Sequence, residues 1–167
     1  MNFFERSPLA LFSAYTYVQA QILEAQRNRV LDELDQAFPG GSDVYSPSLN
    51  SAYGNFWLWT LGAYEVARTM AQHHSCFSKP YADKLTQAKR RLAVYRVPFA
   101  KQELQGKAGS NLVAEASIGT IDVVKRDFAF VVGAERYWVR AEMGAFAELL
   151  SSATLQEILR PIQWSKS

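Results

Sequence analysis

The segment from Glu65 to His74, EVARTMAQHH, holds the residues of this sequence whose types and spacing best fit a chemical reaction. It contains both histidines of the chain, His73 and His74, which follow Arg68 by five and six positions. Histidine changes its protonation state near neutral pH, whereas arginine stays charged and can hold a phosphate. This combination indicates metal-independent cleavage of a phosphodiester, with Arg68 on the phosphate and His73, or less favourably His74, as general acid or base.

Metal binding by the two histidines is a weaker alternative. Adjacent positions on a helix point about 100° apart, whereas paired ligands on a helix usually lie four residues apart. The single cysteine, Cys76, excludes an internal disulfide and a zinc site built from several cysteines, and it fits a reducing cytoplasm. We therefore expect no metal and no cofactor. The chain also lacks an apolar run long enough to span a bilayer, so we expect no membrane association.

The run from Arg68 to His73 resembles the Arg-x4-6-His motif of the HEPN superfamily. That family consists of small helical domains, many of which are metal-independent ribonucleases of toxin–antitoxin and antiviral systems. The resemblance covers one helix. It implies a homodimer in which Arg68 and His73 of both protomers meet across the interface, with Glu65 positioning Arg68 from one turn upstream.

Helix geometry restricts how these side chains meet. Five residues rotate a side chain by about 140°, so Arg68 and His73 share no face of a regular helix. They can meet only if the helix ends or distorts near Gln72, or if a second protomer supplies the partner. The alternative interpretation is structural. In it, Glu65 and Arg68 form an ion pair one turn apart, and the histidines occupy the C-terminal end of the helix, where the dipole favours them.

A basic segment follows the histidines. Residues 79–107 carry eight lysines and arginines against two acidic residues, a net charge of +6 in a chain whose total is +2. One interpretation is a phosphate-binding surface for RNA. Its expected contact residues are Lys89, Arg90, Arg91 and Arg96. The other interpretation is a solvated helix face with no ligand.

Helical periodicity predicts three long helices around these residues. The first runs from Leu9 to about Ala37, with its apolar positions at Leu11, Tyr15, Val18, Ile22, Val30 and Leu34. After a polar loop at residues 42–50, the second runs from near Ser51 to Gln72. It is apolar nearly all round, which is typical of a central helix or of one buried between a core and a dimer partner. The third follows Ser78, and Val97-Pro98 should end or kink it.

The periodicity changes after Gly109. Alternation over Phe128–Val132 and Tyr137–Ala141 predicts a hairpin with its turn at residues 133–135, and residues 111–124 can add one or two strands. A last helix is expected at about 144–159. The order predicts an α+β fold with a three-helix N-terminal block, a small antiparallel sheet or hairpin and a C-terminal helix. The length fits a single domain, 1–167, and a division into 1–105 and 110–167 is the alternative.

Two functions of different classes fit these observations. The first is a cytoplasmic, homodimeric, HEPN-type protein that binds RNA or cleaves it without a metal. The second is a non-catalytic module in which the basic helix and the hairpin edge bind a partner protein, while EVARTMAQHH is scaffold. An Arg68 locked to Glu65, with the histidines directed elsewhere, would favour the second.

Overall fold

The computed structural model describes residues 7–101 and 118–162, which form helices and one small antiparallel sheet. The elements are α2 (Leu9–Phe12), α3 (Ala14–Ala37), α4 (Ser46–Gln72), η1 (His74–Cys76), α5 (Lys79–Lys101), β1 (Thr120–Asp122), β2 (Asp127–Val132), β3 (Glu135–Trp138) and α6 (Val139–Ser151). The strand order is β1-β2-β3. The predicted α+β class is therefore confirmed.

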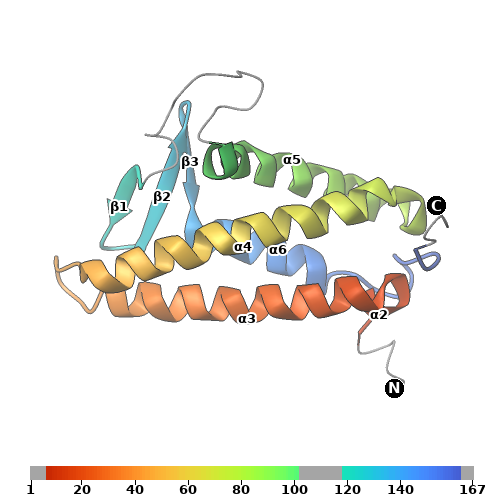
Figure 1. The fold of residues 1–167 in the computed structure, drawn as a ribbon, viewed down its shortest axis with the longest axis horizontal. Coiled ribbons are helices and arrows are strands. Elements are labelled where there is room, and N and C mark those ends of the chain that lie inside the picture. The colour runs from red at the N-terminus through yellow and green to blue at the C-terminus, as the bar shows by residue number, and fades with distance from the viewer. Residues whose placement is uncertain (1–6, 102–117, 163–167) are drawn as a thin grey trace.

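The long helices α3, α4 and α5 run alternately in opposite directions and lie next to one another in a layer (Figure 1). Helix α6 crosses behind α4, and the sheet stands at the end of the layer where α4 begins (Figure 1). Phe146 of α6 packs edge-on against Trp59 of α4, with ring centroids 5.8 Å apart. One face of the helical layer is thus covered by α6 and the sheet.

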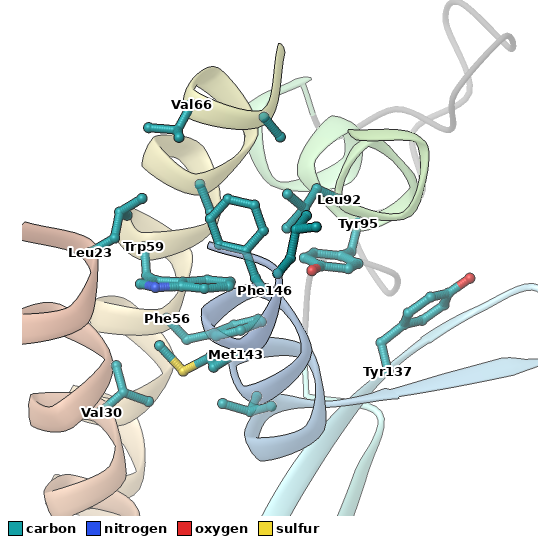
Figure 2. Close-up of a cluster of buried hydrophobic side chains, with 14 of the residues drawn as sticks. Leu23, Val30, Phe56, Trp59, Val66, Leu92, Tyr95, Tyr137, Met143 and Phe146 are labelled. Carbon is teal, nitrogen blue, oxygen red and sulfur yellow. The ribbon is translucent and has the colours of Figure 1, made fainter. Parts of the chain in front are cut away.

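Aromatic side chains make up the centre of the core (Figure 2). Phe56 of α4 stacks on Trp59 at 5.8 Å and on Phe130 of β2 at 5.4 Å. Tyr95 of α5 also stacks on Phe56, with ring centroids 6.0 Å apart. Each buried aromatic ring removes about 150–250 Å² from water, so this cluster ties helices and sheet into one apolar core.

The predicted first helix is interrupted at Ser13. This residue is extended, with φ −162° and ψ 123°, and its hydroxyl accepts a hydrogen bond from the backbone N–H of Thr16 at 3.2 Å. Serine is a favoured N-cap because its oxygen satisfies an N–H that has no partner within the helix. Ser13 therefore starts α3 and separates it from the short α2, so the prediction of one continuous helix from Leu9 was wrong.

The second and third helices are both longer than predicted. Helix α4 begins at Ser46, inside the expected loop, because Pro47 suits a first helical turn and Leu49 is buried against the core. Helix α5 continues through Val97-Pro98 to Lys101. Of the two predicted effects of Val97-Pro98, an end or a kink of the helix, the end was therefore wrong. The candidate residues Glu65 and Arg68 lie on α4 as predicted, and those of the basic segment, Lys89, Arg90, Arg91 and Arg96, lie on α5.

The last helix begins and ends earlier than predicted. Helix α6 starts at Val139 because the carboxylate of Asp127 accepts the backbone N–H of Arg140 at 3.1 Å and so caps the first turn from another element. The expected strand beyond Trp138 is consequently helical. The turn at Gly133 is confirmed, with the φ of +63° that glycine adopts readily. The predicted strands before residue 118 and the boundary near 105–110 lie outside the described residues.

Candidate functional site

Arg68 forms a local ion pair on α4. Its Nε donates to Oε2 of Glu65 at 2.7 Å, and its Nη2 lies at the same distance from that oxygen. Its Nη1 donates to Oε1 of Gln72 at 3.2 Å. Both charged side chains are about half exposed, so the pair is solvated. All three guanidinium nitrogens of Arg68 are therefore engaged by residues of its own helix.

Arg96 of α5 completes this cluster. Its Nη2 lies 3.9 Å from Oε1 of Glu65, and its guanidinium sits over the ring of Tyr64, with 4.9 Å between the guanidinium carbon and the ring centroid. A guanidinium stacked on an aromatic face and paired with a carboxylate has much of its binding capacity used within the protein. Glu65 thus bridges arginines of two adjacent helices.

His73 is the residue at which α4 ends. Its backbone φ is −100° and ψ is 36°, and its N–H donates to the carbonyls of Thr69 and Met70, both at 3.2 Å. Its ring lies 6.5 Å from that of Phe12 in α2. His74 begins η1 and is exposed. The helix therefore ends next to Gln72, which is one of the conditions under which Arg68 and His73 could meet. This ending, however, directs the His73 ring toward α2.

Arg68 and His73 accordingly have different neighbours within one chain. Arg68 faces Glu65 and, through it, α5, whereas His73 faces Phe12 on α2. Neither residue lines the groove between α3 and α6 or the groove between α5 and α6. The arrangement matches the scaffold interpretation of EVARTMAQHH.

The four predicted RNA-contacting residues fall into two groups. Arg91 donates from Nε and Nη2 to both carboxylate oxygens of Glu142, at 2.8 and 2.5 Å, and lies over the ring of Tyr137 at 5.0 Å. Arg96 is paired as above. Lys89 is half-buried and Arg90 is exposed, and neither forms an ion pair with another residue of the described ranges. Only this second pair is free to meet a ligand.

An apolar surface lies on the outer side of α3 and α4. Of the apolar positions predicted for the first helix, Val30 and Leu34 are buried as expected. Tyr15, Val18 and Ile22 are instead 70%, 48% and 61% exposed. Leu58 of α4 is 54% exposed, and the neighbouring Trp57 is exposed too. We call these five residues the outer apolar face. The prediction that Tyr15, Val18 and Ile22 belong to the buried stripe of the first helix was wrong, because helical periodicity cannot distinguish two apolar stripes on one helix.

A groove of about 510 Å³ lies on the opposite flank of α3, against α6. Its lining comes from α2, α3, α4 and α6, and includes Leu9, Leu23, Trp59, Phe146 and Leu150. Because these residues are spread over most of the sequence, no local pattern marks them as one site.

Comparison of the chain with known protein families, with curated proteins and with solved structures finds no match in any of the three. Among residues 7–101 and 118–162, no three histidine, cysteine or acidic side chains gather in a way that would hold a metal ion. In the same residues, no helix has the length and apolar character needed to cross a membrane.

Proposed function

We propose that this protein is a non-catalytic interaction module that self-associates through the outer apolar face. The observation that carries the proposal is the exposure of Tyr15, Val18 and Ile22 on α3 and of Leu58 on α4, two helices that pack against each other. With Trp57, these residues expose large apolar side chains on two neighbouring helices. Exposed apolar patches of a few hundred Å² on a soluble protein are often functional.

The occupant that best fits this face is a second copy of the chain. Two long antiparallel helices present an elongated surface, and its two-fold duplication gives four-helix packing of the kind that buries such stripes. Glu65 and Arg68 lie on the exposed side of the same helix as Leu58. Because Glu65 and Arg68 already pair with each other, this part of α4 carries no net charge that would repel its copy across a two-fold axis.

The contacts of the Arg68–His73 segment support a structural role for it. Arg68 is held by Glu65 and Gln72, and His73 ends the helix against Phe12. In this proposal the cluster fixes α4 relative to α5 and α2, and the surface beside it forms the interface. We expect the protein to act in the cytoplasm, where its one buried thiol, Cys76, stays reduced.

The test is the oligomeric state of Ile22→Lys, measured by sedimentation velocity over a range of protein concentrations. A lysine at the centre of a buried apolar interface costs several kcal/mol, so we expect the parent protein to be a dimer and the variant to be a monomer. Val124→Lys is the matched control, because Val124 is 90% exposed but lies in the β1–β2 turn. A monomeric parent, or two variants with the same oligomeric state, contradicts the proposal.

Nucleic-acid binding by α5 is a second candidate function. Lys89 and Arg90 support it, since both lie outside the ion pairs of the described residues in the basic segment. Fluorescence anisotropy with a single-stranded RNA tests it. Binding should weaken as salt increases and should weaken further in Lys89→Gln/Arg90→Gln. Binding that is insensitive to both changes, or absent, excludes this candidate.

A further inference from the structure

The last described residues, 154–162, run across the end of the helical layer where α4 passes into α5 (Figure 1). We call them the C-terminal clasp. Phe77 and Ile158 form an isolated antiparallel bridge, and both are buried. Beyond the bridge, the backbone N–H of Ile162 donates to the carbonyl of Phe12 in α2 at 2.9 Å. The clasp thus joins the α4–α5 connection to α2, and it contains no residue of the outer apolar face.

The backbone pairing of the clasp is minimal. The N–H of Ser78 donates to the carbonyl of Glu157, and the N–H of Leu159 donates to the carbonyl of Cys76, both at 2.8 Å. In a regular antiparallel ladder, each of these two residue pairs would exchange two hydrogen bonds. Here the N–H groups of Cys76 and Glu157 donate within their own turns instead. Each pair therefore makes one bond where a continuous sheet makes two.

One side chain anchors the clasp to the core. Ile158 is the only residue among 154–162 that is buried, and Ile162 is partly buried against the core. Leu155 and Leu159 are 40% and 63% exposed. Segments held by few buried apolar contacts open at a lower free energy than the whole protein unfolds. The clasp has this property.

The clasp also covers the only thiol of the chain. Cys76 is 4% exposed, and its Sγ lies 3.6 Å from the carbonyl oxygen of Pro161. The neighbouring Arg160 holds this part of the clasp to η1, because its Nη2 donates to Oγ of Ser75 at 2.7 Å. A buried thiol is inert until a motion of the chain exposes it, so the reactivity of Cys76 reports on such a motion.

We propose that the C-terminal clasp opens as a unit while the other helices and the sheet stay folded, and that this opening gates chemical access to Cys76. Opening breaks the bonds of the bridge, withdraws Pro161 from the thiol and removes Ile158 from the core. The alternative is that the thiol reacts only when the whole protein unfolds. The two differ in which residues control the reaction, those of the clasp alone or every residue that stabilises the fold.

Reaction of the intact protein with the aromatic disulfide DTNB tests the proposal. The Cys76 thiolate attacks the reagent, a mixed disulfide forms and one coloured thionitrobenzoate leaves, so absorbance records the rate. We expect a slow reaction whose rate is nearly independent of urea below the unfolding transition, because a local opening exposes little surface. A rate that follows the unfolding equilibrium at all urea concentrations overturns the proposal. So does a rate equal to that of the unfolded protein, since the thiol would then not be gated.

Two variants of neighbouring residues locate the gate in the clasp. Ile158→Ala removes the buried anchor and should accelerate the reaction about thirtyfold. Leu159→Ala is the matched control, because the Leu159 side chain is largely exposed and its backbone N–H remains, so the rate should stay the same. If Ile158→Ala shows no cooperative unfolding transition, Ile158→Val replaces it, with an expected acceleration of about threefold. An unchanged rate in the Ile158 variant overturns the proposal.

Arg91→Met separates local opening from global unfolding. Arg91 pairs with Glu142 of α6 about three turns from the start of α5, outside the clasp. Its loss weakens the whole fold, so a thiol exposed only by global unfolding would react about thirtyfold faster in this variant. We expect the DTNB rate of Arg91→Met to equal that of the parent. A rate that increases in step with its unfolding equilibrium overturns the proposal.

Discussion

Two arginine–glutamate pairs of this protein differ in how they are built and in what they hold together. Arg68 and Glu65 are three residues apart on one helix, and both are about half exposed. Arg91 and Glu142 come from α5 and α6, 51 residues apart in sequence, and the Glu142 side chain is only 5% exposed. The first pair follows from spacing alone, whereas the second exists only because the chain folds α6 against α5.

The difference lies in what each carboxylate loses when its partner is removed. Glu65 faces water and remains solvated without Arg68, so the pair contributes little to stability. Glu142 is buried beside Tyr95, whose phenol has a pKa raised well above its usual value by burial. Without Arg91, the Glu142 charge would have no counterion and little water. The exposed Glu65–Arg68 pair, which the sequence motif reveals, thus contributes less to stability than the Arg91–Glu142 pair, which no sequence motif reveals.

The largest effect is expected from Arg91→Met. The variant leaves Glu142 buried without its counterion, and we expect the free energy of unfolding to fall by about 2 kcal/mol. This is less than the roughly 3–5 kcal/mol of a fully buried pair, because half of the Arg91 side chain is in contact with water. Urea denaturation measures it. Adding Glu142→Gln should restore part of the loss, and a double variant no more stable than the single one would contradict this account.

Asp127 is a buried carboxylate whose hydrogen bonds come from backbone N–H groups and not from a cationic side chain. Its carboxylate accepts backbone N–H groups from Phe128 at 2.9 Å and from Arg140 at 3.1 Å, and it is 3% exposed. Asp127→Ala removes the cap of α6, and we expect a loss of about 1 kcal/mol at neutral pH, measured by urea denaturation. Asp43→Ala, a change of an exposed carboxylate in the loop between α3 and α4, is the control and should cost less.

The effect of Asp127→Ala should also depend on pH. Burial raises the pKa of Asp127 to about 6 from 3.8, against the opposing effect of the two N–H donors. The folded protein therefore binds this proton more tightly than the unfolded chain. The resulting stabilisation is present below pH 3.8 and is lost as the pH rises through about 6. The difference in stability between parent and variant should thus grow as the pH falls across this window, and a constant difference would disprove the raised pKa.

The smallest effects are expected at the motif. Arg68→Ala should change the free energy of unfolding by less than about 0.5 kcal/mol, because an exposed pair one turn apart contributes about that much. We also expect neither the parent nor His73→Ala to cleave RNA in a gel assay without divalent metal. RNA cleavage by the parent that His73→Ala abolishes at unchanged melting temperature would establish the HEPN-type activity and overturn the non-catalytic proposal.

Local signals predicted the parts of the fold that local physics controls. The α+β class, the three long helices and the hairpin turn at Gly133 follow from periodicity and turn chemistry. The errors occur where distant residues act. Helix α6 begins at Val139 because Asp127 caps it across the sheet, and no pattern near residue 139 contains that information.

The candidate sites divide in the same way. The Glu65–Arg68 pair and the position of His73 at a helix end were predicted from spacing and confirmed. The partners of Arg91 and Arg96 were not, because each is supplied by another element. The apolar groove was not predicted either, since its floor is assembled from three helices.

The sequence by itself thus determined that three long helices form, which segments carry charge, and where one local ion pair forms. These properties depend on residues within one or two turns of each other. Only the tertiary structure decided which apolar residues of α3 are buried, which arginines are already neutralised, and toward which helix His73 points. Those outcomes depend on packing between elements far apart in the chain, where the burial of a side chain is set by what covers it and not by its own type.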